Sequence, residues 1–391
     1  MINRVQILKA FDSDLADTLV DVIPCWGYIW IICTDKIYLF KYSASGNSKY
    51  LAYTFVPAST GELIQCAIGF NGYMYIGTTC PDHLSNARVL RLDVSEDSIT
   101  DLITDDGTFL TATAELSMCE AGANEHTILG LATCGQTLLA LYQVFSVGLW
   151  VHRIYRQSDH ATWGLVSTIT IIGVDWLEQI VPATARSSRW RLLADGTYTF
   201  SVASQGSTGI VGYTRKTESG ASVVTIGTTV NTAHVNCGLL HNGWQYADNS
   251  SLRYASDTTY TTDYRIIDAL DLWFANYGSS ATLNPAFISD ADWYGGITWF
   301  GNYFTGLKIV EDDGGGSLTT YYCLAYREPD GNWVIANKIL DSVTGAVQLA
   351  PKYTTWLEGE LVILAPHAGN NNFSIVIPEY TGTVWSKRSG I

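Results

Sequence analysis

The sequence has few charged residues for its length, and most of its charges are negative. Only 15% of the 391 residues are Asp, Glu, Lys or Arg, and 22 basic residues stand against 37 acidic ones, which gives a formal net charge of −15. An acidic surface repels a phosphate backbone, so the composition argues against nucleic acid as a general partner. The scarcity of charge also leaves little material for solvated helices.

Common motifs of catalysis and metal binding are missing. The seven histidines include no His-x-x-x-His pair, the eight cysteines include no Cys-x-x-Cys pair, and there is no Gly-x-Ser-x-Gly sequence. These patterns would have indicated a zinc site, a thioredoxin-like dithiol or a serine hydrolase. We therefore assign no catalytic residue, no metal site and no cofactor from the sequence.

The amino-terminal stretch lacks the features of a secretory signal. Met1–Phe11 has no apolar central region followed by a small-residue cleavage site, and we expect it to be a strand. Residues 128–151 contain no charge and are long enough to cross a membrane as a helix. Their glycines and polar residues instead fit consecutive buried strands, so we expect no membrane span.

The cysteines do not fit a disulfide pattern. In a hairpin centred on Asn71-Gly72, Cys66 faces Gly77 and not Cys80, and Cys25 and Cys33 are unevenly placed about their own turn. Most of the cysteines lie in apolar stretches, where a thiol behaves as a small core residue. We expect thiols, and folding in a reducing compartment.

One hairpin pattern recurs along almost the whole chain. Its clearest example is Ile68–Gly77, in which Asn71-Gly72 separates two runs of strand-forming residues. Asn-Gly is the strongest short hairpin signal because both residues can take positive φ. Similar turns carry further glycines, and a weaker relative has a serine in that place: Gly27, Gly135, Gly243, Gly301, Gly359 and Ser188.

These markers are spaced by about 55 residues on average, somewhat more than the blade length of common propellers. Third and fourth strands follow the turns, for example at 36–42 and 50–56. Four antiparallel strands per unit, arranged radially, leave only short edges. The sequence therefore predicts an all-β fold, a seven-bladed β-propeller of four-stranded antiparallel blades, with residues 1–391 as a single domain.

Three details of this architecture follow from the remaining segments. The amino-terminal strand would complete the last sheet, within 356–378, and so close the ring, although residues 383–388 could also supply that strand. Two stretches fall outside the repeat, at about 104–125 and 268–292. In the first, Ala112–Cys119 has the composition of a short helix.

Several turns between third and fourth strands resemble the Asp-boxes of sialidase-like propellers, whose pattern is Ser-x-Asp-x-Gly-x-Thr-Trp. Fragments of it occur at Ser158–Trp163, Ser256–Tyr260, Glu328–Trp333 and Thr381–Trp385. The family's arginine landmark, Arg-Ile-Pro, has its closest counterpart in Tyr264-Arg265-Ile266-Ile267, which lies in a later unit and lacks the proline. The resemblance therefore implies the fold and not the sialidase activity.

Loops after the second strands of propeller blades open near the ring axis, where propellers bind ligands. The polar residues of such loops are our binding candidates: Asp82, His83, Asp248, His367, Asn370 and Asn371. An alternative for each is a polar loop tip that faces water.

The general character of the chain resembles tail and host-attachment proteins of tailed bacteriophages. It is rich in Gly, Ser, Thr, Tyr and Trp, and it is poor in lysine. The resemblance implies a non-enzymatic virion component made in the host cytoplasm, with other virion proteins in a symmetric assembly as partners and a host-surface glycan as a further candidate. The alternatives are a cytoplasmic location and a carbohydrate-active enzyme with carboxylates on the propeller axis.

Overall fold

The computed structural model describes the strands, the one helix named below and several connections. The described residues are 2–10, 19–41, 48–80, 86–93, 110–120, 123–134, 137–146, 149–159, 162–171, 190–194, 199–205, 210–217, 222–229, 236–240, 243–247, 251–256, 263–277, 288–299, 302–312, 315–327, 332–337, 353–357, 360–366 and 373–380. Contacts divide the chain into two compact units, one formed by Asp17–Ala233 and the other by Met1–Ala16 with His234–Ile391.

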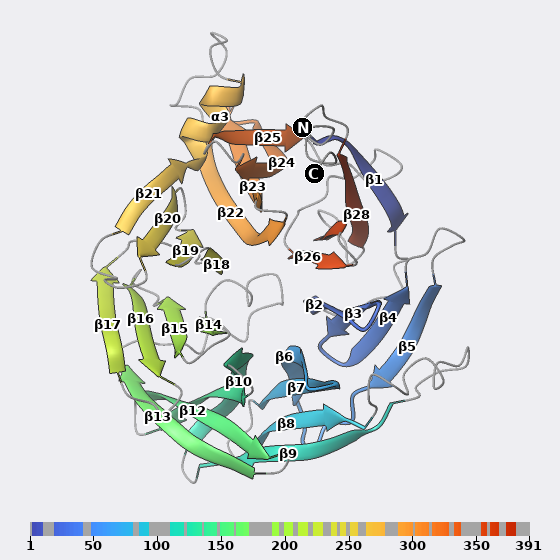
Figure 1. Ribbon diagram of the computed structural model, residues 1–391, viewed down its shortest axis with the longest axis vertical. Coiled ribbons are helices and arrows are strands. Elements are labelled where there is room, and N and C mark those ends of the chain that lie inside the picture. The colour runs from blue at the N-terminus through green and yellow to red at the C-terminus, as the bar shows by residue number, and fades with distance from the viewer. Residues whose placement is uncertain are drawn as a thin grey trace, which may run out of the picture. The chain divides into compact units, whose positions relative to one another are not determined.

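The unit Asp17–Ala233 contains three antiparallel sheets (Figure 1). The first is β2 (Leu19–Cys25), β3 (Tyr28–Cys33), β4 (Lys36–Lys41) and β5 (Ser48–Thr54). The second has eight strands, β6 (Leu63–Phe70), β7 (Tyr73–Cys80), β8 (Ala87–Leu92), β9 (Ala112–Met118), β10 (Ala123–Cys134), β11 (Thr137–Ser146), β12 (Leu149–Asp159) and β13 (Thr162–Ile171). The third is β14 (Trp190–Ala194), β15 (Thr199–Gln205), β16 (Ile210–Thr217) and β17 (Ser222–Thr229).

The other unit also contains three sheets. They are β18 (Asn236–Leu240), β19 (Gly243–Ala247), β20 (Ser251–Ser256) and β21 (Asp263–Asp268); β22 (Ile288–Trp299), β23 (Asn302–Asp312), β24 (Leu318–Arg327) and β25 (Trp333–Asn337); and β26 (Tyr353–Leu357), β27 (Glu360–Pro366) and β28 (Phe373–Tyr380) with β1 (Ile2–Ala10). Within the described residues, the all-β prediction is interrupted by the helix α3 (Ala269–Tyr277).

The predicted hairpins are confirmed where their turns are described. Trp26 and Gly27 have φ of 55° and 74°, and Asn71 and Gly72 have φ of 48° and 79°. Positive φ at both central residues makes a turn whose twist matches that of the flanking strands. Cys66 is paired with Gly77, as expected from the centre of the second hairpin.

The marker at Ser188 lies outside the described residues. It precedes β14, which is the first strand of its sheet, and the connection from β14 to β15 contains Asp195-Gly196. Asp-Gly is itself a strong hairpin signal. β14 and β15 pair antiparallel from Trp190 opposite Ser204 to Ala194 opposite Phe200.

The stretch Ala112–Cys119 was also misassigned, because Ala112–Met118 forms strand β9 and not a short helix. It pairs antiparallel with β8, with Ala87 opposite Met118 and Leu92 opposite Ala112. Alanine and leucine are strong helix formers, but intrinsic propensity differs by less than about 1 kcal/mol per residue and pairing with a neighbouring strand overrides it. β9 is thus the last strand of the four-stranded set β6–β9.

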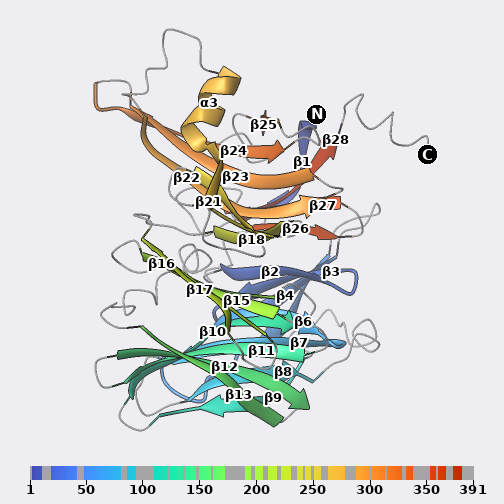
Figure 2. The same ribbon diagram turned by 60° about the vertical axis from the view of Figure 1, so that its left-hand side comes forward.

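The eight-stranded sheet consists of two consecutive sets of four strands. β6–β9 and β10–β13 are joined where β7 pairs with β10, with Cys80 opposite His126 and Thr79 opposite Thr127. Figure 2 shows the strands of both sets together in the lower part of the view. Residues 128–151, the candidate for a membrane helix, form β10, β11 and the start of β12. In the described part of the chain, no helix has the length and apolar character needed to cross a membrane.

Two hydrophobic cores lie on the two faces of β6–β9. The first contains Trp30 and Leu39 from β3 and β4 together with Met74 and Ile76 of β7. The second contains Tyr75 of β7 with residues of β8, β10 and β11. Successive side chains of a strand point to opposite faces, so β7 contributes alternately to both cores.

The amino-terminal strand pairs antiparallel with β28, from Ile2 opposite Tyr380 to Ala10 opposite Ser374. The predicted position of this strand beside the last sheet is therefore confirmed. Residues 383–388, the other candidate for that place, lie outside the described residues.

Candidate functional site

The six predicted binding residues lie outside the described residues. Asp82 and His83 belong to the connection from β7 to β8, Asp248 to that from β19 to β20, and His367, Asn370 and Asn371 to that from β27 to β28. All three connections follow the second strand of a four-stranded set, as the sequence predicted. Their side chains remain binding candidates on that basis alone.

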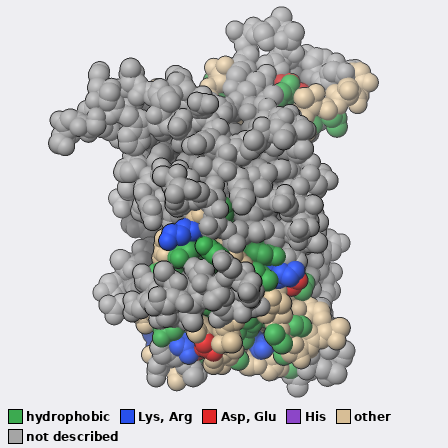
Figure 3. All heavy atoms as spheres, turned by 90° about the vertical axis from the view of Figure 1, so that its right-hand side faces the viewer, with side chains coloured by type: hydrophobic (Ala, Val, Ile, Leu, Met, Phe, Trp, Pro, Cys, Tyr) green, Lys and Arg blue, Asp and Glu red, His purple; other side chains and the backbone are tan. Residues whose placement is uncertain are grey.

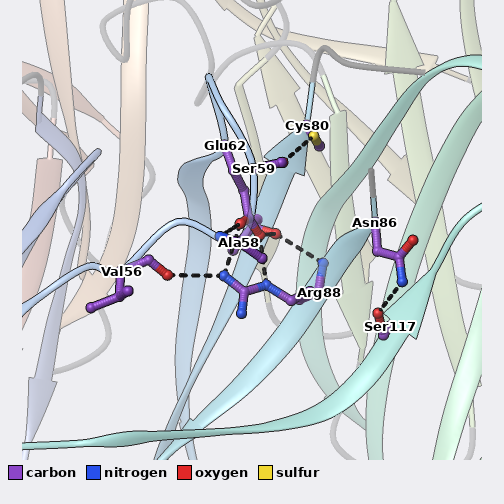
Figure 4. Close-up of polar contacts among 9 residues, drawn as sticks. Val56, Ala58, Ser59, Glu62, Cys80, Asn86, Arg88 and Ser117 are labelled. Atoms are coloured by element: carbon purple, nitrogen blue, oxygen red, sulfur yellow. Dashed lines mark hydrogen bonds and ion pairs between the residues drawn. The ribbon is translucent and has the colours of Figure 1, made fainter. Parts of the chain in front are cut away.

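The described residues contain a buried carboxylate network at the entry to β6 (Figure 4). The Glu62 side chain is fully buried, and the Arg88 guanidinium donates to both of its oxygens from Nε and Nη2, each at 2.8 Å. Thr78 Oγ1 donates to Glu62 Oε1 at 2.8 Å, and the Ala58 amide donates to Oε2 at 2.7 Å. A two-pronged arginine contact of this kind is among the stronger hydrogen-bonded ion pairs.

This network fixes the segment that connects β5 to β6. Arg88 Nη2 also donates to the Val56 carbonyl at 3.1 Å, and its guanidinium carbon lies 5.8 Å from the centre of the Phe55 ring. The Arg88 amide donates to Thr78 Oγ1 at 2.8 Å, so the threonine hydroxyl links β7, β8 and Glu62. We infer that Glu62 and Arg88 hold a surface segment in one conformation.

A second polar cluster lies among β7, β8, β9 and β12. Arg91 Nε lies 2.8 Å from Glu115 Oε1, and the Glu115 side chain is 2% exposed. Gln157 Nε2 lies 3.5 Å from both Glu115 Oε2 and the Tyr75 hydroxyl. Arg91 also covers the ring of Tyr73 at 4.8 Å. Burial raises the pKa of Tyr75, so its hydroxyl stays protonated at neutral pH.

A third group, on β10 and β11, contains an ionisable base. His126 is fully buried, and its Nδ1 lies 2.6 Å from the Tyr142 hydroxyl, with the two rings nearly parallel at 12°. The pKa of Tyr142 is raised, mainly by burial and further by the neighbouring Tyr155 and Cys119. The phenol therefore remains a hydrogen-bonding partner that orients the imidazole.

In the first two clusters, buried carboxylates are neutralised by arginine. Removing either partner of such a pair would leave the other charge buried and uncompensated, so each pair ties together the segments that carry it. Glu62, Arg88 and Glu115 were not singled out from the sequence, because pairs separated by tens of residues meet only after the strands pair. The available signals were the single charged residue of β9, Glu115, and the two arginines of β8, Arg88 and Arg91.

On the face drawn in Figure 3, the described residues show no patch of a single side-chain type. Basic, acidic and hydrophobic side chains of the described residues are interspersed there. Large apolar side chains are exposed at Val56 (70%), Leu165 (54%) and Leu318 (61%), which lie after β5, in β13 and in β24. Scattered apolar side chains of this kind are ordinary on a protein surface.

Comparison with known proteins places the architecture among propellers. No protein-family model matches the sequence, and no curated protein matches it either. Solved structures do resemble the fold. The crystal structure of BBS1N in complex with ARL6DN has a TM-score of 0.50 and 10% identity, covering 97% of this chain and 99% of that one.

Two further structures resemble the chain less closely. The AfRom2 CNH domain has a TM-score of 0.46 and 6% identity over 97% of this chain and 100% of that one. The Trypanosoma rangeli sialidase in complex with sialic acid has a TM-score of 0.37 and 10% identity over 98% of this chain and 60% of that one. At these identities the comparisons concern the fold alone, and the BBS1N structure supports a β-propeller fold.

Proposed function

We propose that this chain is a non-enzymatic interaction protein built as a seven-bladed β-propeller, and that it serves as a tail or host-attachment component of a bacteriophage virion. Its partners would be other virion proteins in a symmetric assembly, with a host-surface glycan as a further ligand. The connections that follow second strands, which carry Asp82, His83, Asp248, His367, Asn370 and Asn371, would supply the contacts.

The grouping of the strands supports this proposal most directly. From β2 to β25, strands pair with their neighbours in consecutive sets of four, and β1 supplies the fourth strand beside β26–β28. Counting β6–β9 and β10–β13 separately, this gives seven sets. A propeller of this kind is a rigid support that presents loops, and such loops commonly carry binding residues.

Two buried charge pairs favour a supporting role for the sheets. Glu62 with Arg88 and Glu115 with Arg91 use their charges to hold neighbouring strands together. The phage assignment rests separately on composition, namely the abundance of Gly, Ser, Thr, Tyr and Trp with few basic residues.

Fractionation of virus particles tests the proposal. Antibodies raised against the purified chain should detect it in particles banded by density, at a fixed ratio to the other virion proteins, and a cryo-electron microscopy map of those particles should show seven sheets per chain. A chain found only as a monomer in the lysate would contradict the virion role. A map with a different number of sheets would contradict the seven-bladed ring.

A loop variant tests where the contacts lie. Replacing Asp82 and His83 with alanine should lower incorporation into particles several-fold if that connection contacts a partner. Thr168→Ala, at an exposed position of β13, is the matched control and should leave incorporation unchanged. Hydrolysis of a host glycan by the purified chain would instead favour the carbohydrate-active alternative.

A further inference from the structure

One cysteine differs from the other described cysteines in its exposure. Cys119, which lies between β9 and β10, is exposed, whereas Cys33, Cys80 and Cys323 are buried and Cys25 and Cys66 are half-buried. Exposure is the first requirement for a thiol that reacts with molecules in solution.

A buried base lies next to this exposed thiol. The Sγ atom of Cys119 is 3.9 Å from Nε2 of His126, within reach of a long hydrogen bond to sulfur. The other ring nitrogen of His126 is held by the Tyr142 hydroxyl at 2.6 Å. Nucleophile, base and orienting group therefore follow one another in a line, which is the arrangement that activates cysteine in many proteins.

Either tautomer of His126 assists the thiol. If Nδ1 carries the proton and donates it to the tyrosine oxygen, the lone pair of Nε2 can accept the proton of the Cys119 thiol. If the Tyr142 hydroxyl donates to Nδ1, the Nε2–H can donate a hydrogen bond to Sγ. The thiolate is the nucleophilic form of cysteine.

The charged neighbours of the group come from two other elements. Glu120, next to Cys119, forms an ion pair with Arg153 of β12. Arg153 is opposite Tyr142 in the pairing of β11 with β12, and Tyr155 packs edge-on against Tyr142 at 6.4 Å. The Glu120 carboxylate is thus engaged by a guanidinium, which limits its repulsion of a thiolate on the adjacent residue.

We propose that Cys119 is a reactive thiol that exchanges with small disulfide compounds to form a mixed disulfide, with His126 as its base. The thiol proton passes to Nε2, and the thiolate attacks one sulfur of the compound. The Cys119–sulfur bond forms as the original sulfur–sulfur bond breaks. The departing thiolate then takes the proton from His126, so no external oxidant or reductant is consumed. This inference does not depend on the proposed virion role.

Cys66 is the internal comparison. Its thiol donates to the Ile128 carbonyl at 3.4 Å. The pKa of this thiol is raised, mainly by burial and further by the negative charge of Asp21. A desolvated thiol that is already hydrogen-bonded stays protonated and reacts slowly.

Labelling of the native protein with the aromatic disulfide 5,5′-dithiobis(2-nitrobenzoate) tests the proposal. Release of the coloured thiolate gives the rate, and peptide mass spectrometry identifies the modified cysteine. Cys119 should react first and at least about tenfold faster than Cys66, and Cys119→Ser should abolish the fast phase. Labelling of Cys66 before Cys119 would overturn the proposal.

The role of the base is tested separately. His126→Asn retains a polar group near the position of Nδ1 but removes Nε2. It should lower the rate of Cys119 labelling about tenfold at pH 7. The difference in rate should shrink toward pH 10, because an ordinary thiol ionises near pH 8.5 without a base. The control is a substitution at Thr127, the residue next to His126. Thr127→Val removes the 2.8 Å contact between the Thr127 and Thr79 hydroxyls and should leave the rate of Cys119 labelling unchanged.

An equal loss of rate in the Thr127 and His126 variants would overturn the role of His126, as would a deficit that is constant with pH. If His126→Asn does not fold, Tyr142→Phe serves in its place. It keeps the aromatic ring but frees Nδ1, and it should slow Cys119 by a smaller factor, whereas an unchanged rate would count against the proposal.

Discussion

Glu62 is a fully buried carboxylate whose negative charge is met by the Arg88 guanidinium, the Thr78 hydroxyl and a backbone amide. Removing only the cation leaves the charge buried without its counterpart. We expect Arg88→Met to lower the free energy of unfolding by about 3–5 kcal/mol. Urea denaturation followed by circular dichroism measures this change.

The matched control is an ion pair near the surface. Lys36 and Asp35 lie 3.6 Å apart with side chains 30% and 46% exposed, and Lys36→Met should cost less than about 1 kcal/mol. The double variant Glu62→Gln/Arg88→Met should recover part of the loss. Similar costs for Arg88→Met and Lys36→Met would show that Glu62 is solvated or otherwise paired.

Gly77 of β7 lies close to Ile128 of β10 and to Cys66 of β6. A Cβ atom there would lie 2.6 Å from Ile128 Cγ2 and 2.7 Å from Cys66 Sγ. We expect Gly77→Ala to lower the free energy of unfolding by about 1–3 kcal/mol because the neighbours must move. Thermal unfolding monitored by calorimetry measures the effect.

Gly164 provides the matched control for Gly77. It lies in β13, and a Cβ atom there would meet nothing within 4 Å. Alanine at this position should be neutral or stabilise the chain by up to about 1 kcal/mol, because it restricts the unfolded state. A Gly77→Ala variant as stable as Gly164→Ala would contradict the close approach of the two strands.

At the scale of elements, the two strand sets β6–β9 and β10–β13 enclose tyrosines whose ionisation is linked to folding. Burial raises the pKa of Tyr75, Tyr142 and Tyr155 in the folded state. Up to the ordinary tyrosine pKa of 10.0, both the folded and the unfolded chain keep these protons. Above it, the unfolded chain loses them first, so stability falls as pH rises.

We expect the free energy of unfolding to decline above about pH 10, by up to about 1.4 kcal/mol per pH unit for fully buried Tyr142. Tyr142→Phe should make this decline shallower, even though losing the contact with His126 lowers stability at pH 7. Urea titrations between pH 8 and 11 give both quantities. Parallel pH profiles for the two proteins would show that Tyr142 is not desolvated.

Hairpins were the elements that the sequence predicted best. Asn71-Gly72 carries its own conformational requirement, and its register correctly placed Cys66 opposite Gly77. The marker inferred from spacing at Ser188 lies outside the described residues. β9 was missed because its strand character comes from pairing with β8 and not from its own residues.

The polar groups between strands could not be predicted in the same way. Arg88 reaches Glu62 across 26 positions of sequence, and Gln157 reaches Tyr75 across 82. No local periodicity encodes such pairs, because they depend on which sheet faces which. The connections that carry Asp82, His83 and His367 were placed correctly after second strands, but their side chains lie outside the described residues.

At the scale of the whole chain, β1 near the amino terminus pairs with β28, the described strand nearest the carboxyl terminus. Without β1, the apolar strand β28 would present an unpaired edge, and such edges promote aggregation. We expect a chain lacking residues 2–10 to aggregate more and to unfold at a lower temperature. Light scattering and thermal unfolding measure these properties.

A synthetic peptide of residues 2–10 should restore part of the lost stability by adding as a strand, whereas a scrambled peptide should not. A chain lacking residues 381–391 keeps both β1 and β28 and is the matched control. Equal behaviour of the two shortened chains, or no response to the peptide, would contradict the importance of this pairing.

Because β1 pairs with β28, this pairing can form only late in synthesis on the ribosome. At about 5–20 residues per second, roughly 20 to 75 seconds separate the emergence of Ala10 from that of Phe373. During this interval the first strand waits without its partner, and its Arg4 and Lys9 are the kind of residues that discourage unwanted pairing. Nascent chains stalled before residue 373 should therefore be more accessible to chaperones at their amino terminus than completed ones.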